Sequence, residues 1–141
     1  MTLSEKFYLY CLQFVGLPYF WGGDDPMEGF DCSGLVQELY HYLGMAPRRD
    51  CTALYLYNFF KNDSYIGVKK LGALAFYGKS MSEISHVAMF LDDIRIIEAG
   101  GGNAMTISRE KASAQNAFIR VRAFDRREDL LTILTPKQLP F

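Results

Sequence analysis

The chain has 141 residues, 50% of them hydrophobic and 15% aromatic, and its 15 Lys and Arg nearly balance 16 Asp and Glu, giving a formal net charge of -1. This hydrophobic content excludes a disordered, collagen-like or coiled-coil chain, and the length predicts a single domain over residues 1–141. Without a positive field the protein has no general attraction to polyphosphate or to an anionic membrane, so neither nucleic acid nor membrane insertion is expected.

The first segment with a clear pattern is a helix over residues 3–15. Apolar side chains recur there at helical spacing, and Thr2 with Glu5 forms a capping box at its start. Gly16 is expected to end the helix. Residues 16–29 then combine Gly, Pro and Asp with aromatic side chains, which predicts a loop that shapes a surface.

Two further helices are predicted. Residues 33–43 carry an apolar stripe and end at Gly44, because glycine readily adopts the left-handed conformation of a helix end. A third helix is expected to begin near Asp50 as its N-cap and to continue to about Phe60. Helices therefore account for much of the first half of the chain.

After Gly67 the pattern changes to short apolar segments separated by Gly, Asp or Ser turns, which predicts strands. The expected strands are residues 73–77, 86–91, 95–98, 104–107 and 118–123. From Pro136 onward an extended terminus is expected. Helices followed by a run of adjacent strands predict an α+β domain with an antiparallel sheet.

The chain contains 3 cysteines, an odd number, namely Cys11, Cys32 and Cys51. They cannot all pair within the chain, which fits a reducing compartment or a functional thiol. No C-x-x-C pair is present and the 2 histidines, His41 and His86, do not cluster with cysteine, so no metal site and no cofactor are predicted. Cys11 lies on an apolar stripe and is interpreted as a small core residue.

The N-terminal residues lack a basic start, an uninterrupted apolar run and a small-residue cleavage site, so they do not form a signal peptide. No stretch approaches the ~20 apolar residues that a membrane helix needs. We therefore expect the chain to be cytoplasmic on synthesis.

Cys32 is a candidate nucleophile because it falls where the loop meets the start of the second helix. The positive end of a helix stabilises a thiolate, and the amides of the first turn can stabilise an oxyanion. A buried cysteine at a helix end is the alternative interpretation.

His86 stands at the head of a predicted strand. Its side chain can face a cleft there, and the strand holds its backbone rigidly. Glu98 ends the next strand, and pairing of the two strands through the turn at Asp92 and Asp93 brings its carboxylate toward the imidazole. The alternative for Glu98 is a polar strand end without a function. His41 lies within the second helix and is expected on its solvated side.

Five blocks of the chain, in family order, resemble the NlpC-type cell-wall peptidases. The blocks are residues 16–23 (GLPYFWGG), 29–36 (GFDCSGLV), 72–77 (GALAFY), 85–91 (SHVAMFL) and 97–100 (IEAG). The most specific part is F-D-C-S-G-L-V preceded by P-Y-x-W-G-G.

The resemblance implies a papain-like α+β fold, with N-terminal helices packed on an antiparallel sheet of about five strands and the nucleophile at a helix N-terminus. It implies that Cys32 attacks a carbonyl carbon and that His86 acts as base and then as acid toward the leaving amine. The substrate class is the peptide stem of bacterial peptidoglycan, most often the bond between γ-D-glutamate and a diamino acid.

The resemblance also implies a set of substrate-binding residues. Tyr19 would lend its hydroxyl, Asp31 and Ser33 would line the pocket beside the nucleophile, and Ser85 would contact substrate just before the base. Trp21 belongs to the aromatic loop at the entrance. These assignments come from the matching positions of the family pattern.

The chain departs from the family pattern at two places. The third polar residue is usually histidine and sometimes asparagine or glutamine, whereas Glu98 stands here, and a carboxylate would make the imidazolium more persistent. The family often has Gly-Asp where this chain has Gly72 and Ala73.

Two other functions remain open at this stage. The same thiol and base could serve an amidase or acyltransferase acting on another substrate, or the fold could persist in a non-catalytic structural component, such as one associated with a phage tail. A catalytic domain without a wall-binding module fits a phage-encoded lytic or tail-associated protein, a secreted toxin or a cytoplasmic recycling enzyme. It would act on the cell wall after delivery by a phage, by lysis or by a secretion system. A phage-tail or effector-assembly partner is the corresponding expectation.

Overall fold

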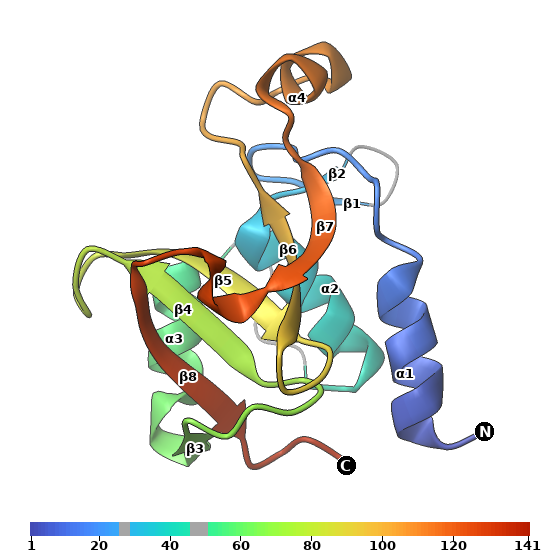
Figure 1. The fold of residues 1–141 in the computed structure, drawn as a ribbon, viewed down its shortest axis with the longest axis vertical. Helices are drawn as coiled ribbons and strands as arrows, with labels where there is room; N and C mark the ends of the chain where they lie inside the picture. The colour runs from blue at the N-terminus through green and yellow to red at the C-terminus, as the bar shows by residue number, and fades with distance from the viewer. Residues whose placement is uncertain (26–28, 46–50) are drawn as a thin grey trace.

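The computed structural model describes residues 1–25, 29–45 and 51–141. Its centre is a 6-stranded antiparallel sheet in the order β3-β8-β4-β5-β6-β7, with helices against one face (Figure 1). The strands of this sheet are β3 (Ser64–Ile66), β4 (Leu74–Gly78), β5 (Ile84–Phe90), β6 (Arg95–Gly100), β7 (Phe118–Ala123) and β8 (Leu130–Pro136). A separate two-stranded ladder joins β1 (Asp24–Asp25) to β2 (Gly29–Phe30).

The helices occupy the N-terminal half of the chain and one late insertion. They are α1 (Leu3–Leu12), α2 (Cys32–Tyr42), α3 (Ala53–Phe60) and α4 (Arg109–Gln115), with short 3₁₀ turns η1 (Lys61–Asp63) and η2 (Phe124–Arg126). In Figure 1, α1, α2 and α3 lie beside or behind the sheet, whereas α4 projects beyond the ends of β6 and β7. The predicted α+β arrangement is confirmed, with six strands where about five were expected.

Polar side chains set where the three N-terminal helices begin. Thr2 caps α1 by accepting the Glu5 backbone N–H at 3.2 Å, as the capping box predicts. Thr52 caps α3 by accepting the Tyr55 N–H at 3.1 Å. The predicted cap, Asp50, lies outside the described residues, and the observed cap lies two residues later than that prediction placed it.

Helix α1 ends at Leu12, earlier than the predicted residue 15. The backbone N–H groups of Phe14 and Val15 bond carbonyls three residues back, so the chain tightens into turns before it reaches Gly16. The helical spacing of apolar residues continues through these turns, so the sequence pattern did not reveal that the helix ends at Leu12.

The predicted strand at residues 104–107 is wrong. Local hydrogen bonds hold a turn there: Met105 N–H donates to Asn103 Oδ1 at 2.8 Å, and Asn103 N–H donates to Thr106 Oγ1 at 2.9 Å. The segment then enters α4. The strand β8 was not predicted, although it pairs with both β3 and β4 and so joins the edge strand β3 to the rest of the sheet.

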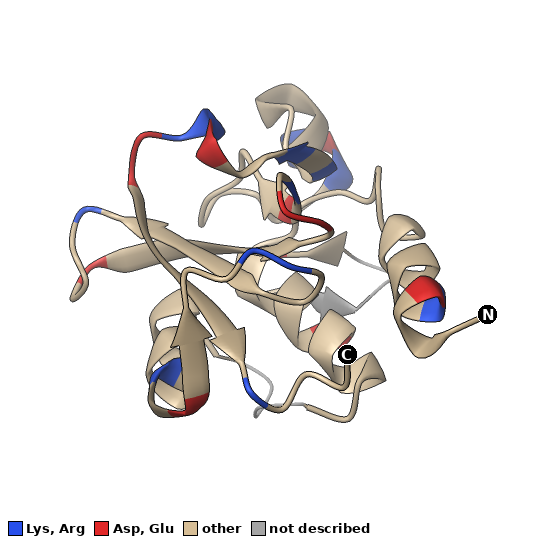
Figure 2. Ribbon diagram, turned by 60° about the horizontal axis from the view of Figure 1, so that its bottom comes forward, with Lys and Arg blue, Asp and Glu red and all other residues tan. Residues whose placement is uncertain are grey.

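Apolar side chains fill both faces of the sheet. The helix side holds the larger cluster, which includes Phe7, Leu35, Leu39, Leu56, Phe76, Val87, Met89 and Ile97. The other face carries Ala73, Ala75, Tyr77, Ala88, Phe90, Ile96 and Ile133, partly covered by Phe124 and Leu130. Figure 2 shows most charged residues in the loops and on the peripheral helices, away from the central strands. None of the helices described combines the length and apolar character needed to cross a bilayer.

Candidate active site

Asp31 ties the aromatic loop to the start of α2. Its Oδ1 accepts the Gly34 N–H at 2.7 Å as the helix N-cap, and its Oδ2 accepts the Gly22 N–H at 3.0 Å. Ser33 also donates from its hydroxyl to Asp31 Oδ1 at 3.3 Å. Cys32 is therefore the first residue of α2, where the sequence predicted it, and its neighbours on both sides fix the helix start.

The loop and α2 pack so closely that side chains are excluded between them. A Cβ atom on Gly34 would overlap the carbonyl oxygen of Gly23. Any larger residue at this position would push the loop away from Cys32, which explains why a glycine follows Cys32 and Ser33.

His86 and Glu98 meet across the strands β5 and β6. His86 Nε2 donates to Glu98 Oε1 at 2.6 Å, and the two side chains are buried, with residue exposures of 7% and 3%. Cys32 lies close enough to the imidazole for its thiol to raise the pKa of His86. Since Glu98 occupies Nε2, the ring nitrogen left for the sulfur is Nδ1. The structure thus joins Cys32, His86 and Glu98 in one chain of contacts.

Burial and pairing act in opposite directions on His86. Burial alone lowers the pKa of His86, but hydrogen bonds to Cys32 and Glu98 and the negative charges of both groups raise it to about 9. The same opposition holds for Glu98. Burial raises the pKa of its carboxyl, but the hydrogen bond to His86 and the positive charge of the imidazolium lower this pKa below its ordinary value. Both effects favour an imidazolium paired with a carboxylate.

A cleft of about 490 Å³ opens beside Cys32. All five residues predicted to bind substrate line it: Tyr19, Trp21, Asp31, Ser33 and Ser85. His86 and Glu98 are not among the lining residues. Cys32 therefore borders the cleft, whereas His86 and Glu98 are buried next to it.

Tyr19 is held rigidly at the edge of this cleft. It is 6% exposed, and its backbone N–H donates to the Ala117 carbonyl at 3.0 Å. Burial, followed by the negative charges of Cys32 and Asp31, raises the pKa of Tyr19 well above the ordinary value, so its hydroxyl remains a donor. Trp21 is 51% exposed and forms part of the rim.

Sequence reasoning missed several cleft residues: Gln37, Cys51, Thr52, Ala53 and Ile84. Gln37 follows Ser33 by one helical turn, and this spacing is the signal that could have found it. The Gln37 Nε2 donates to the Cys51 carbonyl at 3.3 Å, while its buried Oε1 has no hydrogen-bond partner among the residues that the structure describes.

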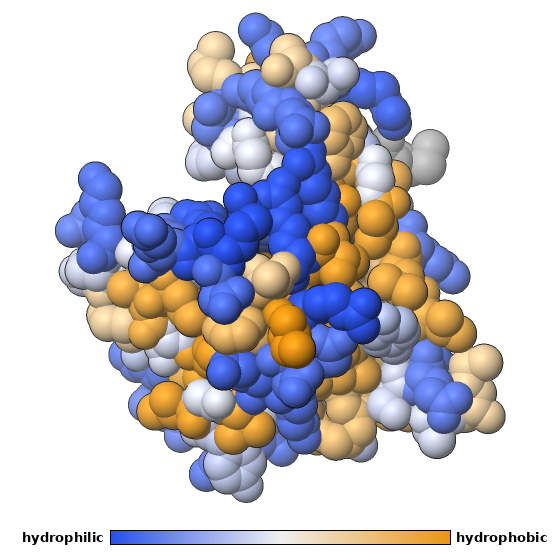
Figure 3. All heavy atoms as spheres, in the orientation of Figure 1, coloured by the Kyte–Doolittle hydropathy of each residue, from blue (hydrophilic) through white to orange (hydrophobic). Residues whose placement is uncertain are grey.

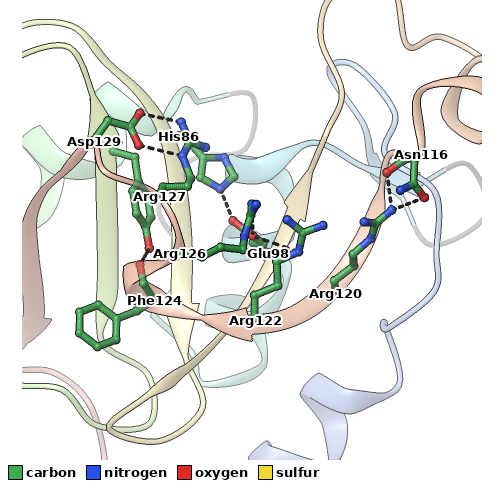
Figure 4. A network of polar contacts seen from close by, with 10 residues as sticks. His86, Glu98, Asn116, Arg120, Arg122, Phe124, Arg126, Arg127 and Asp129 are labelled. Carbon is green, nitrogen blue, oxygen red and sulfur yellow. Dashed lines mark hydrogen bonds and ion pairs between the residues drawn. The ribbon is translucent and has the colours of Figure 1, made fainter.

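Arginines surround the far side of Glu98 (Figure 4). Its Oε2 lies 3.7 Å from an Arg126 nitrogen and 3.9 Å from Arg122 Nε. Arg127 instead pairs with Asp129 at 2.7 Å. The sequence analysis did not connect these residues to the site, because β7 and η2 are distant from Glu98 along the chain.

The remaining cysteine and histidine assignments are consistent with a structural role or an exposed position. Cys11 is fully buried, and burial raises the pKa of its thiol to about 12. His41 is exposed in the last turn of α2, as predicted. Across residues 1–25, 29–45 and 51–141 no three His, Cys, Asp or Glu side chains gather in a way that could hold a metal ion.

Residues 16–123 match the NlpC/P60 family, and the chain belongs to that family. It is 35% identical over 101 residues to the probable endopeptidase YafL of Escherichia coli, covering 69% of this chain and 40% of YafL. It is 34% identical over 108 residues to the bifunctional muramidase/DL-endopeptidase CwlT of Bacillus subtilis, covering 70% of this chain and 30% of CwlT. The chain thus spans less than half of either relative.

Solved structures show the same fold. RipD of Mycobacterium tuberculosis, described as a non-catalytic NlpC/p60 domain protein adapted to peptidoglycan binding, matches with a TM-score of 0.70 at 19% identity. The match covers 97% of this chain and 98% of the RipD chain. The family resemblance and the fold inferred from the sequence are therefore confirmed.

Proposed function

We propose that the chain is a cysteine peptidase that hydrolyses peptidoglycan stem peptides, at the bond between γ-D-glutamate and a diamino acid. The observation that carries the proposal is the buried contact between His86 and Glu98 at 2.6 Å, with Cys32 beside the same imidazole at the edge of a cleft. A nucleophile, a base and a group that orients the base are the parts that thiol-dependent acyl transfer requires.

In the proposed mechanism the Cys32 sulfur attacks the scissile carbonyl carbon. The positive end of α2 stabilises the oxyanion that forms, because Cys32 is the first residue of that helix. The His86 imidazolium then donates its proton to the leaving amine, and the neutral imidazole activates the water that releases the acyl group. Glu98 holds the ring and stabilises its charged form.

The proposed substrate class rests on the family and on the cleft. One relative's name includes a DL-endopeptidase and another's an endopeptidase, which supports cleavage of a peptide bond between residues of unlike configuration. Tyr19 and Ser85 would position the stem peptide, with Asp31 and Ser33 beside the nucleophile and Trp21 at the entrance. Delivery to the wall by a phage, by lysis or by a secretion system, with an assembly partner, belongs to the same proposal.

A binding protein without activity is the second candidate, because the match with RipD extends over nearly the whole of both chains. The contacts among Cys32, His86 and Glu98 favour the enzyme, since a purely binding role does not need them.

Mass spectrometry of defined muropeptides decides between these functions. We expect the chain to release products whose masses correspond to cleavage after γ-D-glutamate, and Cys32→Ala to abolish release without unfolding the protein. Cys11→Ala is the matched control, because the same atoms are removed from a buried cysteine outside the cleft. It should lower stability by roughly 1 kcal/mol and keep kcat.

Binding of muropeptides without cleavage would support the RipD-like function. Products of another mass would identify a different bond. Hydrolysis that persists in folded Cys32→Ala would contradict the proposed nucleophile.

A further inference from the structure

Glu98 is a buried carboxylate with charged neighbours on both oxygens. Oε1 accepts from His86 at 2.6 Å, and Oε2 faces Arg126 at 3.7 Å and Arg122 at 3.9 Å (Figure 4). Only 3% of Glu98 is exposed. A buried charge is stable only when it is paired. Because His86 contacts only Oε1, the negative charge on Oε2 needs a second positive partner.

The two arginines reach Glu98 from different elements. Arg122 lies on β7, where it pairs in register with Ile96, two residues before Glu98 on β6. Arg126 lies in η2, the turn that follows β7. Two elements thus bring positive charge to the same oxygen.

The neighbouring arginines make their hydrogen bonds elsewhere, although Arg120 pairs in register with Glu98. The hydrogen bond to Asp129 raises the pKa of Arg127, and the charge of Glu98 raises it further. The Arg120 guanidinium donates to Asn116 Oδ1 at 2.6 Å and to the Asn116 carbonyl. Arg127 donates to both oxygens of Asp129, at 2.9 and 2.7 Å, and lies 5.0 Å from the Tyr77 ring centre. Arg122 and Arg126, in contrast, each form one ion pair within the described residues, and in both cases the partner is Glu98.

We propose that Arg122 and Arg126 are positioning residues of the site: they hold the Glu98 carboxylate ionised and directed at His86, and they offset part of its charge so that the imidazolium can release its proton. The proposal rests on the function proposed above. A lone buried carboxylate would bind the imidazolium so strongly that the ring would remain protonated during the step in which it must act as a base.

The surroundings of His86 allow this effect to be isolated. The charged or titratable groups that act on it come from four elements or turns: Cys32 on α2, Glu98 on β6, Tyr77 on β4 and Asp129 before β8. The arginines act on His86 through Glu98. The Arg122 side chain is 26% exposed and that of Arg126 is 51% exposed, so solvent screens the second more.

Figure 3 shows how polar and apolar residues are distributed on this face of the molecule. Hydrophilic residues gather over the upper part of the sheet, around the hollow between the α4 region and the loop that joins β4 to β5. Because the side chains of Arg122 and Arg126 are partly exposed, their removal should change the charge near Glu98 without opening the apolar core.

Titration of His86 by NMR tests the proposal without any need for activity. The background is Cys32→Ala, and the chain has 2 histidines, so exposed His41 serves as the internal reference. We expect Arg122→Gln and Arg126→Gln each to raise the His86 midpoint, and the double variant to raise it by about 0.5 to 1 pH unit. Arg122→Lys and Arg126→Lys should restore most of the original midpoint, because they keep the charge.

Arg120→Gln is the matched control, since it removes an arginine from the same strand that is bound to Asn116. It should leave the His86 midpoint unchanged. An unchanged midpoint in the folded double variant would overturn the proposal, as would an equal shift with Arg120→Gln. If the Lys variants shifted the His86 midpoint as much as the Gln variants do, the proposal that the arginines act through their charge would be overturned.

With Cys32 present, the acid limb of kcat should move to higher pH in the double Gln variant while KM stays the same. A change confined to KM would contradict a positioning role. If the wild-type chain cleaves no muropeptide, the proposed function fails, whereas the titration still reports on the arginines.

Discussion

At the scale of single residues, Glu98 couples the two halves of the site. One of its oxygens orients His86 and the other lies among arginines, so its charge influences both the base and the surface behind it. A neutral side chain at this position could keep the hydrogen bond. Only a carboxylate also stabilises the imidazolium through its charge.

We expect Glu98→Gln to lower kcat about tenfold and Glu98→Ala about a hundredfold. A hydrogen bond to a charged group contributes about 1.5–3 kcal/mol, which corresponds to losses of this size. The measurement is kcat on a defined muropeptide. Glu83→Gln, an exposed carboxylate in the loop before β5, is the control and should keep full activity.

If Glu98→Ala retained the wild-type kcat together with an unchanged His86 titration, the carboxylate would be only a strand end. Another group, such as the Asn103 side chain, would then have to orient the imidazole.

Cys32, His86 and Glu98 were predictable because local patterns mark the helix and the two strands that carry them. Cys32 is the first residue of α2, as predicted, whereas His86 is the third residue of β5 rather than its head, and β6 continues two residues beyond Glu98. The antiparallel pairing of β5 with β6 still brings these two side chains together. Arg122 and Arg126 were not predictable in this way. Their approach to Glu98 depends on the register of β7 and on the turn after it, which no short-range pattern specifies.

At the scale of elements, the segment that follows β6 supports the cleft. Gly102 lies directly against the ring of Tyr19, and a Cβ atom at this position would overlap that ring. The segment therefore connects the strand that ends near Glu98 to a residue of the cleft wall, and its close packing requires a glycine.

Gly102→Ala should displace Tyr19 and lower both stability and kcat/KM. Overpacking of this kind costs about 1–3 kcal/mol, and a displaced cleft residue should reduce kcat/KM roughly tenfold. The matched control is Gly100→Ala, whose Cβ would lie 3.7 Å from the Glu98 carboxyl carbon, an ordinary contact. Thermal unfolding and kcat/KM are measured for both. Equal behaviour of the two variants would show that Tyr19 adapts and that the contact has no structural importance.

Two of the elements that the sequence did not predict, α4 and β3, lack a continuous buried face. The helix α4 buries only Ala112 among its residues, so it has no apolar stripe to reveal it. The strand β3 is three residues long and lies at the sheet edge. Elements with a continuous buried face, such as α2 and β5, were found because burial imposes a period on the sequence.

At the scale of the whole molecule, the buried pair links the protonation of the site to the stability of the fold. His86 holds a proton more tightly in the folded protein than in the unfolded chain, and Glu98 holds one less tightly. The two groups therefore limit stability from opposite ends of the pH range.

We expect the free energy of unfolding to fall as pH rises from about 6.5 through 9. The pKa of His86 is raised from 6.5 to about 9, so the folded state binds the additional proton and its stabilising effect is complete only below 6.5. Full loss would amount to on the order of 3 kcal/mol. At the acid end, the lowered pKa of Glu98 contributes stability above 4.5, which is lost as pH falls through that lowered value.

Urea denaturation between pH 6 and 8.5 measures the basic side of this dependence. The range stops there because the pKa of buried Cys11 is raised from 9.0 to about 12, and at higher pH its ionisation in the unfolded chain would add a second decline. In Glu98→Gln the slope should flatten, since glutamine cannot favour the imidazolium by charge, whereas Glu83→Gln should reproduce the wild-type slope. A wild-type stability that is constant from pH 6 to 8.5 would mean that His86 gains no proton affinity on folding. The contact between His86 and Glu98 would then be a hydrogen bond to a neutral imidazole and not an ion pair.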